Sequence, residues 1–254
     1  MSYLMKSLLS VSVSLCLAST PCFAAPFSNQ VSDKQISGLH KAVVLMYHRI
    51  SDTPGSMSVS PAQFKEEMSD IKSGGYHVIS AWQLVDSLYS HTAIPEKSIV
   101  ITFDDGWASQ RTAIPVLKDY GYPATFALIT SVINKHGYLG AHDIENAEEY
   151  GLYFVNHSRT HFTHDFLRYP SIDIPLAKAE LSEFTVTHPF FVYPYGSHSP
   201  ALIKSLKENG YVAAFGVEGI PVDPGKSDIF NIPRFLINSD INEIKFRNIL
   251  KESN

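Results

Sequence analysis

Short apolar runs alternate along this chain with stretches of helical pattern, and this alternation constrains the fold more than any other feature. Each run is brief, rich in β-branched or aromatic side chains, and followed by a polar or turn residue, which is typical of buried strands. We therefore predict strands at residues 43–46, 98–103, 124–128, 152–155, 190–192 and 212–215.

The segments between these runs are candidate helices with apolar side chains on one face. Residues 61–73 show the full pattern, with Pro61 in the first turn and Gly74 directly after the last one. The other candidates are residues 81–89, 108–120, 142–150 and 199–209. Repeated strand-then-helix order predicts an α/β fold, with a mostly parallel sheet or barrel and helices outside it. In such folds the functional side chains gather where the strands end.

Residues 1–24 have the layout of a secretory signal peptide. Lys6 is the single charged residue before an apolar run at residues 8–17, and small residues then lead to a cleavage site after Ala24. The run is short for a transmembrane helix, although an uncleaved anchor is the alternative. We expect an exported protein, periplasmic or secreted, with no stable membrane span after cleavage.

We expect the rest of the chain to form an exposed lead-in, residues 25–40, and one domain, residues 41–254. Both cysteines, Cys16 and Cys22, precede the cleavage site, so the mature protein would contain no disulfide and no thiolate metal site. The formal net charge is −5, and no cluster rich in lysine or arginine occurs. We therefore expect no nucleic-acid partner. The sequence does not indicate the oligomeric state.

Two adjacent carboxylates, Asp104 and Asp105, follow the apolar run 98–103, and Gly106 permits a tight turn behind them. Adjacent side chains at a strand end cannot both face the core, so one can bind a cation while the other stays free as a base. The alternative is a plain turn, in which the Asp-Asp-Gly sequence caps the following helix.

Two histidines, His157 and His161, follow the apolar run 152–155 at a spacing of four. On a helical turn this spacing places both rings on one face, close enough to share a metal ion. With one carboxylate they would form a two-histidine, one-carboxylate set that leaves positions open for water and substrate. The alternatives are a histidine pair without a metal, and His164 as a substitute ligand or a surface residue.

A third candidate element is Val192-Tyr193-Pro194-Tyr195-Gly196, which closes the run 190–192. It is either an ordinary proline–glycine turn or a wall of the cleft whose backbone N–H is available to an oxyanion.

Together these three elements resemble the polysaccharide deacetylase family, the NodB-homology group within carbohydrate esterase family 4. Their order, their spacing and their positions at strand ends all agree with that family, and the likeness spans about residues 43–237. The resemblance implies a distorted (β/α) barrel of the NodB type in a single domain. It also implies a hydrolase that removes N-acetyl groups from a polysaccharide and releases acetate.

Carried over to the matching positions, the resemblance implies a role for each site residue. Asp104 would be the general base, while Asp105, His157 and His161 would hold a divalent metal. Tyr195 would donate its backbone N–H to the oxyanion. Histidine and carboxylate ligands suit zinc best, with nickel, cobalt and iron as alternatives.

Two departures from the usual family pattern affect these expectations. Val192 occupies a position where many members carry an arginine, and no histidine follows His198 to serve as the C-terminal acid. However, His48 ends the run Leu45-Met46-Tyr47-His48. This resembles the exported poly-N-acetylglucosamine deacetylases, in which these elements are permuted to the N-terminus. We expect His48 to be the catalytic acid, the alternative being a histidine that caps a buried strand.

Three further residues are candidates for substrate binding. Arg234 could replace the missing arginine by pairing with Asp104, or it could be a surface arginine after a turn. Trp107 and Tyr193, like Tyr47, could offer faces on which sugar rings stack, although aromatic residues are also ordinary core material.

We therefore predict an N-deacetylase whose partner is an acetylated amino-sugar polysaccharide resembling poly-β-1,6-N-acetylglucosamine. The alternatives are a peptidoglycan, chitin-oligomer or acetyl-xylan deacetylase with the same site, and a glycan-binding protein that has lost turnover. An enzyme is favoured by the intact set of site residues, Asp104, Asp105, His157 and His161. The altered arginine position is the feature that favours the alternative of a glycan-binding protein.

Overall fold

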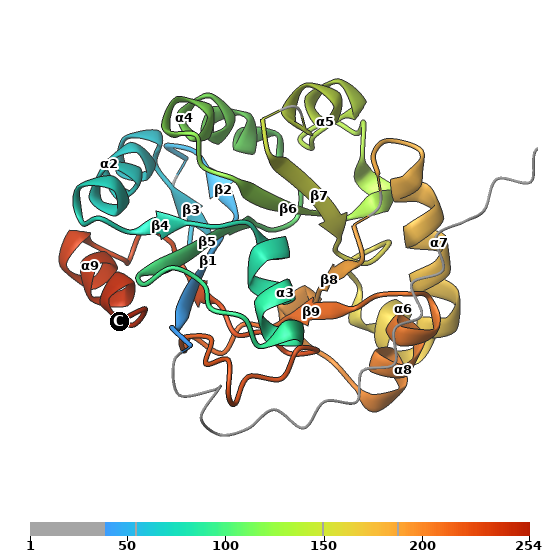
Figure 1. Cartoon of the computed structure of the whole chain (residues 1–254). Helices are drawn as coiled ribbons and strands as arrows, with labels where there is room; N and C mark the ends of the chain where they lie inside the picture. The colour runs from blue at the N-terminus through green and yellow to red at the C-terminus, as the bar shows by residue number, and fades with distance from the viewer. Residues whose placement is uncertain (1–38, 54, 149, 187) are drawn as a thin grey trace, which may run out of the picture. The chain divides into compact units, whose positions relative to one another are not determined.

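The computed structural model describes residues 39–53, 55–148, 150–186 and 188–254. The predicted signal peptide, residues 1–24, and all but the end of the predicted lead-in lie outside the described residues. At the centre of the domain is a parallel sheet in the strand order β10-β1-β5-β6-β7-β8-β9, with β4 paired to β5 (Figure 1). A separate parallel pair is formed by β2 and β3.

The strands that the apolar runs predict are all present, and the structure adds four short ones. The predicted set is β1 (Ala42–Tyr47), β5 (Ser98–Phe103), β6 (Ala124–Leu128), β7 (Leu152–Asn156), β8 (Phe190–Val192) and β9 (Ala213–Phe215). The added strands are β2 (Arg49–Ile50), β3 (Ser58–Val59), β4 (His77–Val78) and β10 (Phe235–Leu236). Two residues are too few to produce an alternating pattern, so these four leave no signal in the sequence.

The sheet curls into a half-barrel. Leu45 and Met46 of β1 pair with β10, while β1 pairs along its full length with β5. A parallel bridge joins Phe215 at the end of β9 to Ile232, and the chain then continues into β10. Residues 229–236 thereby span the space between the two ends of the sheet. The structure confirms the predicted α/β fold with a distorted barrel.

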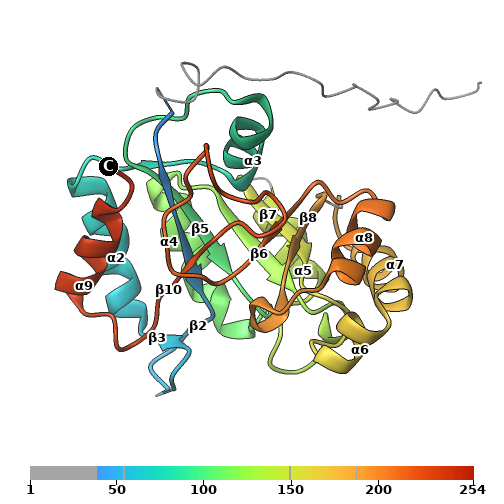
Figure 2. The same ribbon diagram turned by 90° about the horizontal axis from the view of Figure 1, so that it is seen from below.

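Helices surround this sheet (Figures 1 and 2). Both views place α9 beside α2, and group α6, α7 and α8 beyond β8 and β9. The helices are α2 (Pro61–Ser73), α3 (Ala81–Ser90), α4 (Ala113–Tyr120), α5 (Ala141–Glu148), α6 (Thr163–Arg168), α7 (Pro170–Ser182), α8 (Pro200–Glu208) and α9 (Glu243–Lys251).

Three helices, α6, α7 and α9, are not predicted from the sequence, and α4 begins later than expected. Residues 108–112 form a 3-10 turn before α4. In α7 two prolines obscure the helical pattern: Pro170 lies in the first turn, where its missing N–H is tolerated, whereas Pro175 lies inside the helix. Serine side chains cap two of the predicted helices: Ser60 caps α2, and Ser80 forms a capping box with Gln83 at the start of α3.

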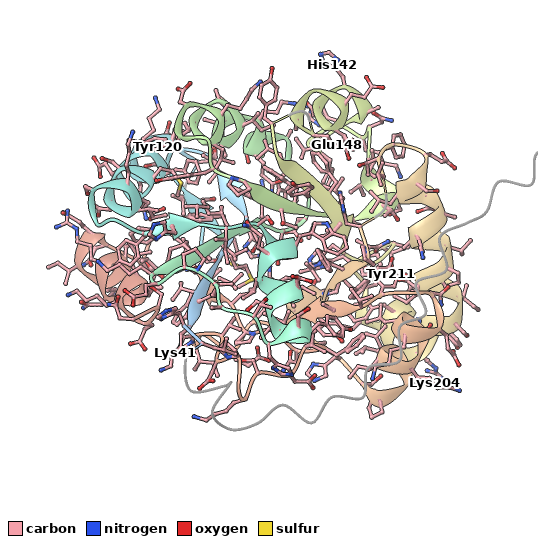
Figure 3. The ribbon with its side chains drawn as sticks, in the orientation of Figure 1. Lys41, Tyr120, His142, Glu148, Lys204 and Tyr211 are labelled. Atoms are coloured by element: carbon pink, nitrogen blue, oxygen red, sulfur yellow. The ribbon has the colours of Figure 1, made fainter. Side chains whose placement is uncertain are left out.

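Both faces of the central strands are buried, as expected for a parallel sheet covered on each side. On β1, Val43 and Leu45 pack with α2, α4 and α9, whereas Val44 packs toward α3 and the segment around Val222. Figure 3 shows the outer surface of the domain, where charged side chains such as Lys204 of α8 project outward. In the described part of the chain, no helix has the length and apolar character needed to cross a membrane.

Candidate active site

A cleft of about 820 Å³ lies where the central strands end. Its polar lining comes from residues that directly follow β1, β5, β7 and β8, which are far apart in the sequence. A parallel sheet brings the carboxyl ends of its strands to one edge, so this convergence follows from the fold. The predicted residues that line the cleft are His48, Asp104, Asp105, Trp107, His157, His161 and Tyr195.

Within this cleft, Asp105, His157 and His161 form a group that fits a divalent metal. One ligand atom from each lies within 4.8 Å of the others. The Nε2 atoms of His157 and His161 are 3.4 Å and 3.3 Å from Oδ1 of Asp105. That oxygen is buried and has no hydrogen-bond partner among the described residues, so it is an acceptor left for a cation. Two imidazoles and a carboxylate are a donor set for zinc and similar ions.

The predicted helical turn between the two histidines is wrong. Residues 157–161 form an irregular turn, in which Ser158 and His161 adopt positive φ angles of 64° and 67°. The hydroxyl of Ser158 accepts a hydrogen bond from the backbone N–H of His161 at 2.9 Å. This compact turn brings the ring centroids within 4.9 Å, so the two rings converge although no helix is present.

Two helices that the sequence does not reveal hold this histidine turn in place. The backbone N–H of Arg159 donates to Asp173 of α7 at 3.3 Å, and its Nε donates to Glu180 at 2.7 Å. On α6, Asp165 accepts a hydrogen bond from the hydroxyl of Thr160 at 2.6 Å. The turn is therefore fixed from outside the cleft, which leaves the imidazoles free to face inward.

The tautomer of His157 is set by a backbone carbonyl. Nδ1 of His157 lies 2.8 Å from the carbonyl oxygen of Val192, so Nδ1–H donates there and Nε2 is left with a lone pair for a metal. This contact uses the main chain of residue 192. It is therefore independent of whether the side chain there is valine or arginine.

The arginine missing from position 192 is replaced from elsewhere in the chain. Arg234 is fully buried and donates to both carboxylate oxygens of Asp104, each at 2.7 Å. Burial acts to raise the pKa of Asp104, but the Arg234 guanidinium outweighs it and holds the pKa below its usual range. This geometry agrees with the expected pairing of Arg234 with Asp104 and excludes the alternative of a surface arginine. Because Arg234 has no exposed surface, it does not contact substrate directly.

His48 lies in the same cleft, and its Nδ1 is buried with no hydrogen-bond partner in the described structure. Burial lowers the pKa of His48, while the carboxylates of Asp104 and Asp105 act in the opposite direction. Gln110 fixes the nearby backbone by donating to the carbonyl oxygens of His48 and Asp104, at 2.9 Å and 2.6 Å. A histidine that directly follows the first strand, β1, thus reaches this cleft.

Tyr195 adopts a left-handed backbone conformation, with φ 58°, on the turn after β8. Its side chain is exposed, and its ring centroid lies 4.4 Å from that of His161. Within the described chain its N–H makes no backbone–backbone hydrogen bond. Gly196 behind it has φ 67°, and a Cβ there would lie 2.4 Å from Val217. The turn therefore packs closely against the segment after β9.

The structure corrects the placement of two aromatic residues predicted to stack on sugars. Tyr193 is fully buried, and its hydroxyl donates to the carbonyl oxygen of Phe230 at 2.9 Å, so it is a core residue. Tyr47 is likewise buried and donates to Glu67 at 2.8 Å. Trp107 does line the cleft, but its Nε1–H donates to Oδ2 of Asp105 at 2.8 Å.

Several walls of the cleft are absent from the sequence-based prediction. Met57, Tyr138, Phe162 and Val217 all line it. They lie on loops, whose paths are not encoded in any hydrophobic period, so the sequence carries no signal that would place them together. Phe162 directly follows His161 and is more than two-thirds exposed, and Met57 and Val217 are exposed apolar side chains as well.

Comparison with known proteins gives a consistent pattern. The family model described as "Polysaccharide deacetylase" matches residues 91–214. A poly-β-1,6-N-acetyl-D-glucosamine N-deacetylase of Staphylococcus epidermidis is 26% identical over 258 residues, which cover 89% of this chain and 87% of that protein. The Escherichia coli protein of the same name is 24% identical, over 77% of this chain.

The chain spans only part of some relatives. It covers 36% of the Escherichia coli protein, and 66% of a candidate polysaccharide deacetylase of Bacillus subtilis that is 26% identical over 73% of this chain. Among solved structures, IcaB of Ammonifex degensii aligns with a TM-score of 0.74 at 22% identity, covering 84% of this chain and 97% of that one. At this identity the structural match establishes the fold.

Proposed function

We propose that this chain, whose residues 91–214 match the polysaccharide deacetylase family model, is a metal-dependent hydrolase of that family that removes N-acetyl groups from an N-acetylglucosamine-containing polysaccharide and releases acetate. The observation that carries this proposal is the convergence in one cleft of the Asp105–His157–His161 group and the Asp104–Arg234 pair. Such a site combines a place for a Lewis acid with a carboxylate held ionised beside it.

The proposed polysaccharide resembles poly-β-1,6-N-acetylglucosamine. Two relatives that align over most of this chain are named for that substrate. The position of His48 after the first strand agrees with the same subgroup. Peptidoglycan, chitin oligomers and acetyl-xylan are the competing substrates for the same site. We propose export to the periplasm or the exterior from the signal-like pattern of residues 1–24.

Asp105, His157 and His161 would hold the divalent ion, for which zinc is the leading candidate, and the ion supplies Lewis-acid activation of water and of the acetyl carbonyl. Asp104 accepts the proton of the attacking water, because Arg234 keeps its carboxylate ionised. The Tyr195 N–H donates to the oxyanion that develops on the carbonyl oxygen.

His48 completes the reaction by protonating the departing amine. Burial lowers the pKa of His48, so the ring takes up the proton that the attacking water released to Asp104 and passes it to the amine. The two neighbouring carboxylates favour that positive charge. His48 is thereby suited to relay a proton within the cleft, rather than to carry one permanently.

The decisive experiment measures acetate release from a panel of acetylated glycans, with and without added Zn²⁺, Ni²⁺ or Co²⁺. We expect release from poly-β-1,6-N-acetylglucosamine oligomers, and release about 10²–10⁴-fold slower from the Asp104→Asn protein. Faster acetate release from acetyl-xylan or peptidoglycan would contradict the proposed substrate. Glycan binding without acetate release, at full metal occupancy, would identify a binding protein instead.

A further inference from the structure

Trp107 makes a directional contact to one oxygen of the Asp105 carboxylate. Its Nε1–H donates to Oδ2 at 2.8 Å, while the other oxygen, Oδ1, is the one nearest to the two histidines. The hydrogen bond thus decides which oxygen faces the His157–His161 pair. An indole N–H can only donate, so Oδ2 is the acceptor and the contact fixes the rotation of the carboxylate.

The ring of Trp107 is itself held by one aromatic side chain and one cationic side chain. Tyr138 stacks on it with a centroid separation of 4.6 Å and an interplanar angle of 21°. The guanidinium carbon of Arg49 lies 3.5 Å from the centroid of the same ring. The aromatic stack and the cation–π contact both stabilise the ring in this position.

Backbone contacts anchor the same stack. Trp107 and Tyr138 form an antiparallel bridge, and Ala108 donates to the carbonyl oxygen of Gly137 at 2.8 Å. Arg49 lies in β2, directly after His48. The stack therefore ties together the segments that follow β1, β5 and β6.

Asp105 needs such support because its backbone is in a sparsely populated conformation. Its φ is 74°, and the next residue, Gly106, also has φ 74°. The left-handed region is unfavourable for a non-glycine residue, and such conformations persist where the surroundings over-determine them. The Trp107 hydrogen bond and the stack behind it do so, together with the hydrogen bond from Gln110 to the carbonyl oxygen of Asp104.

We propose that Arg49 and Tyr138 are positioning residues, which clamp Trp107 so that its N–H holds Asp105 in the orientation that binds metal. This inference rests on the proposed function, since it concerns the same metal group. It also gives Trp107 a role other than sugar stacking: its ring is occupied by Tyr138 and Arg49. Hydrogen bonds to metal ligands are worth about 10–100-fold in metal affinity or activity.

The first arm of the test is Trp107→Phe, which keeps an aromatic ring and removes the N–H. We expect Zn²⁺ affinity, measured by competition with a chromophoric chelator, to fall about 10–100-fold. With acetate release as the readout, KM for the glycan should stay unchanged, and excess Zn²⁺ should restore kcat. A sugar-stacking role would instead raise KM and give no rescue by metal.

The matched control is Trp82→Phe, since these are the chain's two tryptophans. Trp82 also donates its Nε1–H to a side chain, Nδ1 of His188 at 3.0 Å, but does not line the cleft. We expect this control to bind Zn²⁺ like the wild type. In that background Trp107 is the single tryptophan, and Co²⁺ should quench its fluorescence at the concentration at which it binds.

The second arm tests the clamp in the Trp82→Phe background. Arg49→Lys retains a cation and should keep most of the affinity, whereas Arg49→Met should weaken Zn²⁺ binding and shift the Trp107 emission. Wild-type Zn²⁺ affinity in both Trp107→Phe and Arg49→Met would overturn the inference while leaving the deacetylase proposal intact. A wild-type protein that binds no metal and releases no acetate would refute the proposed function itself.

Discussion

Asp104 and Asp105 are neighbours in the chain, yet their carboxylates have different partners. Asp104 is buried and holds the two guanidinium nitrogens of Arg234, whereas Asp105 offers Oδ1 to two histidines. Burial alone would raise the pKa of both, but in each case the local partners outweigh it and lower the pKa. Both carboxylates are therefore ionised near neutral pH, and their roles differ through geometry alone.

Asparagine substitution should separate these two roles. Asp104→Asn should retain metal and lose about 10²–10⁴-fold in turnover, the usual contribution of a general base. Asp105→Asn should lower bound metal directly, because it removes the charged ligand. Elemental analysis of both purified variants beside acetate release provides the measurement. Equal metal loss in the two variants would contradict the assignment of Asp104 as the base and Asp105 as the metal ligand.

Substitution of His48 tests the proton donor. His48→Gln should cut amide turnover while metal content and thermal unfolding stay near the wild type, since Nδ1 of His48 has no partner to lose within the described residues. An acetyl ester should suffer less, because an alkoxide leaves more readily than an amine. Turnover of amide and ester is compared in both proteins. Equal losses on both substrates would argue against a role as the amine's acid.

At the scale of elements, the strands and their polar ends were predictable because each strand is a buried run followed by a functional residue. The turn that carries His157 and His161 was not, because its shape depends on Asp165 and Asp173 of helices α6 and α7. Arg234 illustrates the same limit: its contact with Asp104 links residues 130 positions apart. Sequence spacing cannot encode such a distance, although the chemistry suggested the pair.

The turn after β8 gives an element-scale prediction. Gly196→Ala should reduce turnover by up to about 10²-fold, the cost of displacing an oxyanion donor, because its Cβ would collide with Val217 and shift Tyr195. Gly121→Ala, at the end of α4, is the matched control: its φ is 66°, but a Cβ there meets nothing within 4 Å. Metal content should stay normal in both. A loss of turnover in the control equal to that in Gly196→Ala would show backbone strain alone to be responsible.

At the scale of the whole domain, a buried carboxyl outside the cleft joins the first strand to the C-terminal region. Glu67 of α2 accepts hydrogen bonds from Tyr47 of β1 and from Gln63, each at 2.8 Å. Gln63 also donates to the carbonyl oxygen of Ile241, ahead of α9, at 3.0 Å. Burial is the main cause that raises the pKa of Glu67 to about 7.

This raised pKa predicts how the stability of the domain depends on pH. The folded state keeps a proton on Glu67 between pH 4.5, its ordinary pKa, and about 7, whereas the unfolded chain releases it. The contribution of Glu67 is therefore fully present below pH 4.5 and is lost as pH rises through 7. The linked change in the free energy of unfolding is at most about 3 kcal/mol. Glu67→Gln should remove it, so urea unfolding at pH 5 and pH 8 should differ less in this variant than in the wild type. The same exchange at exposed Glu145 should leave the wild-type dependence unchanged, and a Glu67→Gln protein with that same dependence would contradict the assignment.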